Sequence, residues 1–92
     1  MIVRYRARAL ANIDDIYAYL YERNPRGAQN VLRAILKGVD LIGARPLASP
    51  STQRAGIRVK LITRYSYKIF YRIVDDTVVI IHVRHMSRHP WP

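Results

Sequence analysis

Three histidines, His82, His85 and His89, stand close together near the end of this 92-residue sequence. Their spacing of three and four residues would place the imidazoles on one side of a helix, where they could share a metal ion. The β-branched residues just before them favour a strand, in which His82 and His85 point to opposite faces. Because the sequence has no cysteine and no carboxylate near these histidines, we predict no metal site and no cofactor.

The sequence gives little support for nucleophilic catalysis or for nucleotide binding. The serines lack the elbow motif of a triad nucleophile, and there is no glycine-rich loop that could cradle a phosphate. Metal-free cleavage of RNA stays open, because a histidine could activate a 2′-hydroxyl while arginines stabilise the charge that develops on phosphate.

Basic residues interleaved with aromatic ones form the strongest chemical signal in the sequence. No carboxylate occurs between Arg45 and Val74. Arginine binds phosphate or carboxylate through a two-pronged fork, and aromatic rings stack on bases, so such a surface suits RNA or an acidic peptide. The alternative is that these are solvated strand positions that protect sheet edges from aggregation. We predict a binding surface formed by Arg58, Lys60, Arg64, Lys68, Arg72, Arg84 and Arg88.

The composition indicates a small folded domain with an acidic partner. Half of the residues are apolar, which is enough for one modest core, and we expect a single domain over residues 1–92. Sixteen lysines and arginines against six aspartates and glutamates give a formal charge of +10. An imbalance of this size attracts polyanions or acidic protein segments.

Residues 58–85 are expected to form the basic sheet. Three runs rich in Val, Ile, Tyr and Phe are separated by polar breaks at Thr63-Arg64 and Asp75-Asp76, which is typical of three consecutive antiparallel strands. Alternation in the middle strand predicts a core-facing set of Tyr67, Ile69, Tyr71 and Ile73. In the last strand the polar residues predict an outward set of Ile80, His82 and Arg84, and an inward set of Val79, Ile81 and Val83.

The residues before the sheet are expected to cover one of its faces. Residues 2–5 are compatible with a short edge strand, and apolar residues further on recur at intervals of three and four, which predicts amphipathic helices. Asn24 and Pro25 end one helix and begin the next, as N-cap and first residue of a tight helical hairpin. Gly43 is expected to form a left-handed C-terminal cap, and Gly38 to mark a close packing contact.

The remaining segments are predicted to be irregular. Residues 45–56, which hold proline and serine, read as a loop, and residues 85–92 read as a tail in which Trp91 packs back on the domain. The first residues lack the apolar segment of a signal peptide, and no apolar run approaches the roughly 20 residues that span a bilayer. We therefore expect a cytoplasmic location and no membrane partner.

Several stretches resemble the ParE/RelE superfamily of bacterial type II toxins. Residues 9–20, ALANIDDIYAYL, are similar to its first-helix pattern A-x-x-D-(L/I)-x-x-I-x-x-Y-(I/L), except that Asn12 stands where an acidic residue is usual. Residues 45–47, RPL, resemble its x-P-x-x-G loop without the glycine. Residues 56–59, 65–73 and 78–85 with Arg88 resemble its block G-x-R-x…Y-x-I-x-Y-x-(I/V)…V-x-I-(L)-x-V-x-H-x-x-R.

The resemblance covers nearly the whole chain and is closer to the ParE, or plasmid-stabilisation, branch. It implies an α+β fold with an N-terminal strand, an antiparallel helical hairpin and a three-stranded antiparallel meander, with the helices packed on one face of the sheet. It also implies a growth-inhibiting toxin that is neutralised by a cognate antitoxin, through an acidic or amphipathic C-terminal segment, in a toxin–antitoxin hetero-oligomer.

The resemblance leaves two targets open. ParE-like members poison DNA gyrase by binding it, without chemistry of their own. RelE-like members are ribosome-dependent endoribonucleases that cut mRNA, and in that case Arg58, Lys60 and Arg84 would hold phosphate. His85 or His89 would then act as acid or base. A nucleic-acid-binding module without toxicity is a third interpretation of the same residues.

Overall fold

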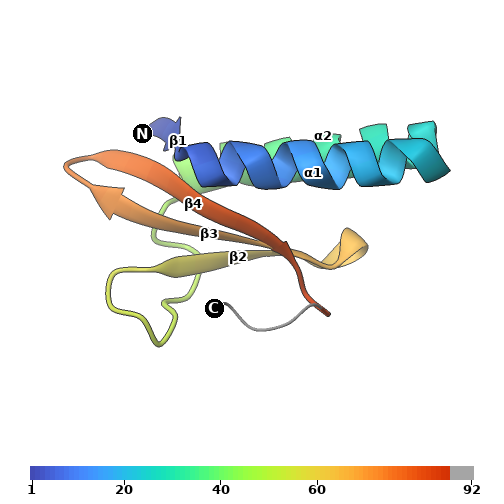
Figure 1. Ribbon diagram of the computed structural model, residues 1–92. Coiled ribbons are helices and arrows are strands. Elements are labelled where there is room, and N and C mark those ends of the chain that lie inside the picture. The colour runs from blue at the N-terminus through green and yellow to red at the C-terminus, as the bar shows by residue number, and fades with distance from the viewer. Residues whose placement is uncertain (88–92) are drawn as a thin grey trace.

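The computed structural model describes residues 1–87, so the roles expected for Arg88, His89 and Trp91 lie outside the described residues. Two helices lie together on one face of a four-stranded sheet (Figure 1). The predicted α+β class and the placement of the helices are thereby confirmed. The elements are β1 (Ile2–Tyr5), α1 (Ala7–Arg23), α2 (Pro25–Ala44), β2 (Arg58–Ile62), a 3-10 turn (Thr63–Tyr65), β3 (Tyr67–Val74) and β4 (Thr77–His85). Neither helix is long and apolar enough to cross a membrane, within this described part of the chain.

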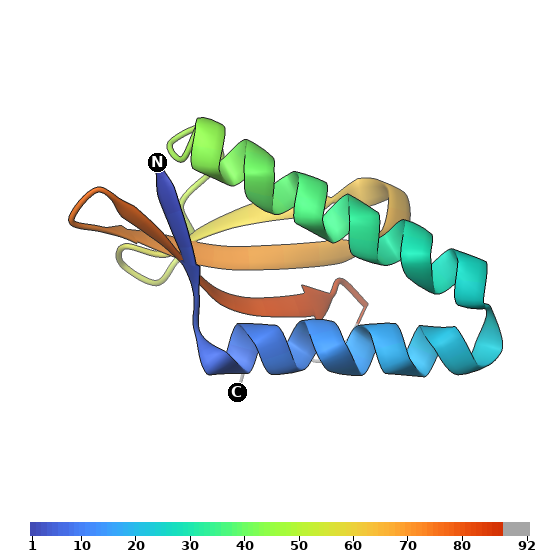
Figure 2. The same cartoon turned by 90° about the horizontal axis from the view of Figure 1, so that it is seen from above.

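The helical hairpin forms where the sequence predicts it. The Asn24 Oδ1 atom accepts a hydrogen bond from the Gly27 N–H at 3.0 Å, and Pro25 is the first residue of α2. A side-chain oxygen at this position satisfies one of the amides that a helix start leaves without a partner. Seen from above, the two helices meet at the hairpin and diverge from it, with strands of the sheet visible between them (Figure 2). Helix α1 packs on β4, and α2 packs on β2 and β3.

The two glycines of α2 both mark close packing. A Cβ atom on Gly38 would lie 2.5 Å from the Cδ1 atom of Ile62, so the predicted close contact is confirmed, with β2 as the neighbour. The prediction that Gly43 forms a left-handed cap is wrong, because α2 continues to Ala44. Gly43 is instead buried against β1, where a Cβ atom would meet Val3 Cγ2 at 3.0 Å.

The sheet is mixed, with strand order β1-β4-β3-β2. Strands β2, β3 and β4 pair antiparallel in sequence order, but β1 pairs parallel to β4. Antiparallel pairing therefore describes only part of the sheet. The parallel pair is possible because the chain between β1 and β4, which contains the helical hairpin, β2 and β3, provides the long connection that such pairs need. Strand β1 reaches only from Thr77 to Ile80 of β4, so within residues 1–87 no strand covers the outer edge of the second half of β4.

A β-bulge changes which side chains of β4 face the core. Phe70 pairs with His82 and Tyr71 pairs with Ile80, which leaves Ile81 as the extra residue. Before the bulge, Val78 and Ile80 are in the core, so the predictions that Ile80 faces outward and that Val79 faces inward are both wrong. After the bulge, Val83 is in the core and the alternate residues His82 and Arg84 lie on the other face, as predicted. One inserted residue reverses the alternation.

The core lies between the helices and the sheet. Tyr67, Ile69 and Tyr71 of β3 are buried in it, and Ile73 packs against it, which confirms the core-facing set predicted for this strand. The buried Tyr71 side chain is satisfied, because its hydroxyl donates to the Pro46 carbonyl at 2.6 Å. This bond also attaches the loop after α2 to the sheet.

Candidate functional site

The predicted basic residues divide between the two faces of the sheet. Paired residues on neighbouring strands point to the same face. Lys68 pairs with Arg84, and both alternate with core residues, so their side chains lie on the outer face, away from the helices. Arg58 pairs with Tyr71 and Lys60 with Ile69, and both partners are core residues. The side chains of Arg58 and Lys60 therefore point to the helix side.

Arg58 has a structural partner. Its Nη1 atom donates to the Ser49 carbonyl at 2.7 Å and so holds the loop that follows α2. Arg64 lies in the 3-10 turn at one end of the sheet, with its guanidinium 5.4 Å from the centre of the Tyr65 ring. These two side chains do not join the outer-face residues.

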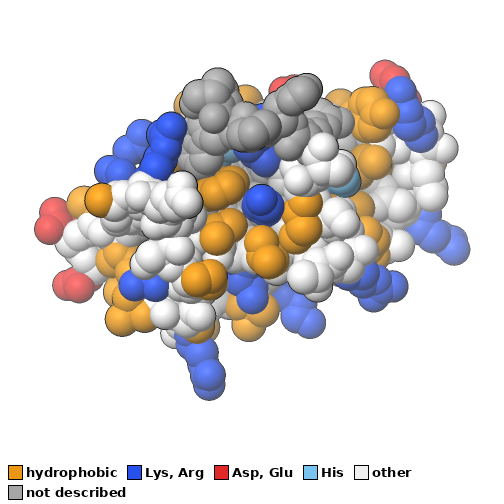
Figure 3. Space-filling view, turned by 90° about the horizontal axis from the view of Figure 1, so that it is seen from below, with side chains coloured by type: hydrophobic (Ala, Val, Ile, Leu, Met, Phe, Trp, Pro, Cys, Tyr) orange, Lys and Arg blue, Asp and Glu red, His pale blue; other side chains and the backbone are white. Residues whose placement is uncertain are grey.

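The outer face combines basic and apolar side chains. Figure 3 shows hydrophobic and Lys or Arg side chains next to one another on this side, with Asp and Glu toward the rim. Lys68 lies directly opposite Arg84, and an anionic ligand would relieve the repulsion between these two like charges. Within residues 1–87, the Nε atom of Arg72 and the Nη1 atom of Arg84 are buried and have no hydrogen-bond acceptor. Both donors are suited to a carboxylate or phosphate oxygen.

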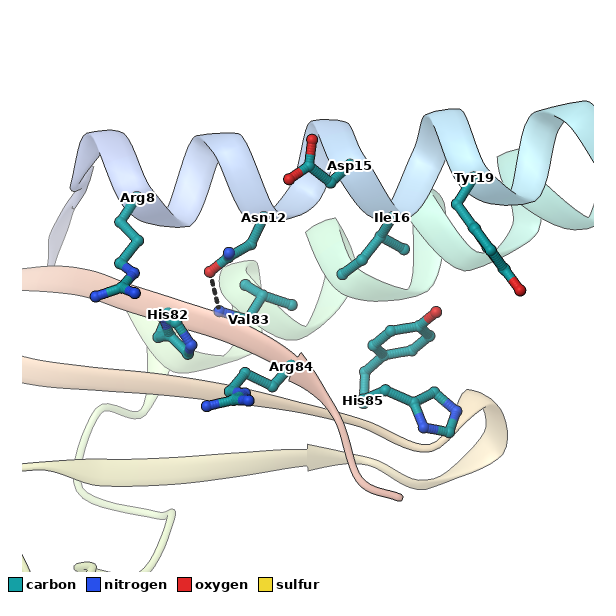
Figure 4. A pocket seen from close by; sticks show the side chains of 10 residues that line it. Arg8, Asn12, Asp15, Ile16, Tyr19, His82, Val83, Arg84 and His85 are labelled. Atoms are coloured by element: carbon teal, nitrogen blue, oxygen red, sulfur yellow. Dashed lines mark hydrogen bonds between the residues drawn. The ribbon is translucent and has the colours of Figure 1, made fainter. Parts of the chain in front are cut away.

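A cleft of about 390 Å³ opens where β1 no longer covers β4 (Figure 4). We call it the α1–β4 cleft. Arg8 and Asn12 extend into it from α1, and His82, Arg84 and His85 line it from β4. The cleft is continuous with the outer face because His82 and Arg84 belong to both.

Asn12 links the two walls of this cleft. Its Oδ1 atom accepts a hydrogen bond from the Val83 N–H at 3.1 Å (Figure 4). Val83 belongs to the half of β4 that has no neighbouring strand on this side in the described part of the chain, so a helix side chain takes the place of a strand carbonyl. Asn12 is the residue at which the sequence departs from the first-helix pattern. It supplies a hydrogen-bond acceptor to the edge of the sheet at Val83.

The environment of His82 lowers the pKa of its imidazole below the ordinary value. Its side chain is 4% exposed, and its ring lies 6.4 Å from the ring of Phe70. Burial lowers the pKa of this imidazole, and the nearby charges of Arg84 and Arg8 lower it further. The cationic wall of the cleft thus disfavours a further positive charge inside it.

His85 occupies the end of the cleft on the helix side. Its ring stands edge-on to the Tyr67 ring at 5.1 Å, and its Nδ1 atom lies 2.7 Å from the Ser87 hydroxyl. No carboxylate orients this pair among the contacts of the described residues, so it lacks the third member of a catalytic triad. Residues 1–87 also contain no group of three His, Asp or Glu side chains placed to hold a metal ion.

Sequence reasoning missed the contribution of α1 to the site. Arg8, Asn12, Ile16 and Tyr19 line the cleft and recur at intervals of three and four, which is one face of a helix. That spacing was visible in the sequence. Which strand the face would meet was not, because the meeting depends on the pairing of β1 with only part of β4.

Solved toxin–antitoxin structures share this fold. A chain of the chromosomal ParDE system from P. aeruginosa has a TM-score of 0.84 and 19% identity, and the match covers 95% of this chain and 97% of that one. A chain of the RelBE2 complex from Mycobacterium tuberculosis has a TM-score of 0.66 and 26% identity over 91% and 95% of the two chains. The E. coli RelBE complex contains a chain with a TM-score of 0.66 and 15% identity, over 95% and 98%. The fold is that of the ParE/RelE superfamily.

Sequence comparison narrows this class to one branch. The model of the family described as "ParE toxin of type II toxin-antitoxin system, parDE" matches residues 3–90. Protein Y4kP of Sinorhizobium fredii is 31% identical over 90 residues, which is 98% of this chain and 92% of that protein. The chain belongs to the ParE toxin family of type II toxin–antitoxin systems.

Proposed function

We propose that this toxin inhibits growth by binding and poisoning DNA gyrase in the cytoplasm, and that a cognate antitoxin with an acidic or amphipathic segment neutralises it. The observation that supports binding is the outer face, where Lys68 lies opposite Arg84 and two buried guanidinium N–H groups have no acceptor among the described residues. An acidic surface on a partner protein would supply the missing acceptors and neutralise the cationic pair.

The positions of the basic residues favour binding over RNA cleavage. Arg58 and Lys60 project to the helix side of the sheet, whereas Arg84 projects to the outer face. Stabilising one transition-state phosphate requires donors that converge on the same atoms. Arg58 is also engaged with the Ser49 carbonyl at 2.7 Å.

The proposal is tested by gyrase-catalysed supercoiling in the presence of the purified toxin. We expect inhibition by the wild-type chain and an inhibitory concentration at least tenfold higher for Lys68→Glu, because the change removes attraction and adds repulsion on the outer face. Arg26→Glu, an exposed basic residue at the hairpin end of α2, is the matched control and should inhibit like the wild type.

Two outcomes would contradict this proposal. Full supercoiling at excess toxin would exclude gyrase as the target. Cleavage of ribosome-bound mRNA that is lost in His85→Ala would favour the endoribonuclease activity of the RelE branch.

A further inference from the structure

The α1–β4 cleft has a cationic end and an aromatic end. At the cationic end, the guanidinium groups of Arg8 and Arg84 lie on either side of the His82 ring (Figure 4). The other end is lined by Ile16, Tyr19, Tyr67 and His85. The α1 wall from Arg8 to Tyr19 rises about 16 Å at the helical 1.5 Å per residue. A ligand that contacts both ends therefore needs a charged group and an apolar body of several carbon atoms.

The positive charge of the cleft is only partly balanced. Among the described residues that line it, two arginines accompany one carboxylate, that of Asp15. Arg8 extends from α1 toward β4, whereas the Asp15 carboxylate stays beside the helix (Figure 4). Within residues 1–87, Arg8 forms no ion pair, and the buried Nη1 atom of Arg84 has no hydrogen-bond acceptor. Because a buried donor without an acceptor is costly, the cationic end is suited to the oxygens of one anion.

Asn12 places a neutral donor between the two ends. Its Oδ1 atom accepts the hydrogen bond from the Val83 N–H at 3.1 Å, and its Nδ2 atom carries two N–H groups that can donate to an anion. An aspartate here could accept the same bond, but its charge would lie one helical turn from Arg8 and would repel an anion. The bond also joins the two walls, so a ligand lies over it and not between them.

The aromatic end offers surface for an apolar body. The Tyr67 and His85 rings stand edge-on at 5.1 Å, and Tyr19 is 50% exposed. Aromatic side chains bind rings and alkyl groups with large contact areas. The volume of the cleft, about 390 Å³, lies in the range of sites for small molecules, roughly 300 to 1,000 Å³. Such sites combine apolar walls with a few polar groups that fix the orientation of the ligand.

We propose that the α1–β4 cleft binds a single carboxylate attached to a small aromatic or aliphatic body. Arg8, Arg84 and the Nδ2 group of Asn12 hold the carboxylate, and the body lies against Ile16 and the aromatic rings. A planar carboxylate matches the two-pronged fork of a guanidinium. A monoanion fits better than a phosphate dianion, because the Asp15 charge at the rim repels a second negative charge.

The test measures binding of hydrocinnamate to isotope-labelled toxin by nuclear magnetic resonance. We expect chemical-shift changes at the Val83 amide and along residues 8–19 of α1. Hydrocinnamide, which lacks the charge, and acetate, which lacks the ring, should each bind at least tenfold more weakly. Equal binding of hydrocinnamate and its amide, or shifts spread evenly over the basic residues of the protein, would overturn the proposal.

The end of a peptide chain offers the same chemistry as a free carboxylic acid. A tripeptide of two glycines and a terminal phenylalanine, with its C-terminal amide as control, separates the two sources. Tighter binding of the peptide acid than of hydrocinnamate would identify a chain end as the source of the carboxylate, and the opposite order a free small molecule. Failure of both acids to bind would overturn the site.

Charge variants provide a second test with a matched control. Arg8→Gln should weaken hydrocinnamate at least fivefold, and Asn12→Asp, which keeps the acceptor for Val83, at least tenfold. Arg33→Gln removes the same charge from an exposed position on α2 and should change the affinity less than twofold. Equal effects of Arg8→Gln and Arg33→Gln would show non-specific attraction to a cationic protein and overturn the site.

His82 reports whether the cationic end is occupied. The charged groups around its ring are Arg8 and Asp15 on α1, Lys68 and Arg72 on β3, and Arg84 on β4. A bound carboxylate offsets the positive charges, so the pKa of His82 should be higher in the complex than in the free toxin. Hydrocinnamate should accordingly bind more tightly as the pH falls through this pKa. An unchanged pKa at saturation would place the carboxylate elsewhere and overturn the assignment.

These measurements are independent of the proposed function. None of them uses gyrase or growth arrest, and Arg8 and Asn12 lie on α1, away from Lys68 on the outer face. Failure of hydrocinnamate to bind would therefore leave gyrase inhibition standing, and the reverse also holds.

Discussion

At the scale of single residues, Asn12 has a role that its position in the sequence did not indicate. Its side chain satisfies the Val83 amide at the uncovered edge of β4. Asn12→Ala should lower the free energy of unfolding by about 1 to 3 kcal/mol, because it leaves a part-buried N–H without an acceptor. Urea unfolding followed by circular dichroism measures this loss.

The control for Asn12 is the acidic residue that is usual in the family. Asn12→Asp keeps an oxygen acceptor and places it near Arg8, so we expect it to retain most of the stability that Asn12→Ala loses. Equal stability of Asn12→Ala and the wild type would show that solvent satisfies the Val83 amide.

His82 should make stability depend on pH. Its pKa is lower in the folded protein than the usual value of about 6.5, so the unfolded chain takes up this proton first as the pH falls. The contribution of the neutral His82 side chain to stability should therefore be fully present above about pH 7. It should decline below about pH 6.5, by at most about 1.4 kcal/mol per pH unit for this one group.

The measurement for His82 compares unfolding of the wild type and His82→Gln at several pH values between 5 and 8, with the range chosen around the usual pKa. Glutamine does not titrate, so the pH profile of the variant should be flatter. Equally steep profiles would assign the pH dependence to other groups.

At the scale of secondary-structure elements, the close contact of α2 with β2 depends on Gly38, which has no side chain. Gly38→Ala should favour the helix by about 1 kcal/mol but force a methyl group against Ile62 Cδ1, at a cost of about 1 to 3 kcal/mol. We expect net destabilisation in the wild-type background, measured by thermal or urea unfolding.

A double-mutant cycle identifies the cause. Ile62→Val removes the Cδ1 atom that a Cβ on Gly38 would meet at 2.5 Å. In that background Gly38→Ala should be neutral or stabilising, because the helix preference remains and the main contact is gone. Additive effects would place the strain elsewhere, for example at Ile69 Cδ1, which lies 3.2 Å from the same position.

Elements also determine which parts of the sheet edges have a neighbouring strand among the described residues. Strand β1 is short, so β4 keeps an uncovered half that α1 reaches through Asn12. The loop after α2 covers only the beginning of β2, and within residues 1–87 no strand pairs with the end of this edge. The α1–β4 cleft begins where β4 loses β1 as its neighbour.

At the scale of the whole molecule, the charge of +10 is divided among separate surfaces. Arg84 and Lys68 lie on the outer face, Lys60 and Arg64 line a hollow between α2 and the end of β2, and Arg58 holds a loop. From the sequence alone, these residues were predicted to form one binding surface. These basic residues therefore do not form one continuous surface in the folded protein.

The sequence by itself determined the features that depend on neighbouring residues. The Asn24-Pro25 junction, the strand breaks and the alternation in β3 follow from local propensity and periodicity, and the structure has them as predicted. The superfamily also follows from local motifs in order.

Only the tertiary structure decided the features that depend on pairing between distant segments. The parallel pairing of β1, the bulge at Ile81 and the burial of Gly43 against Val3 each join residues far apart in the chain. Alternation along a strand gives two faces but not a register, and one inserted residue exchanges them. For this reason the basic residues were identified from the sequence, whereas the surface to which each belongs was not.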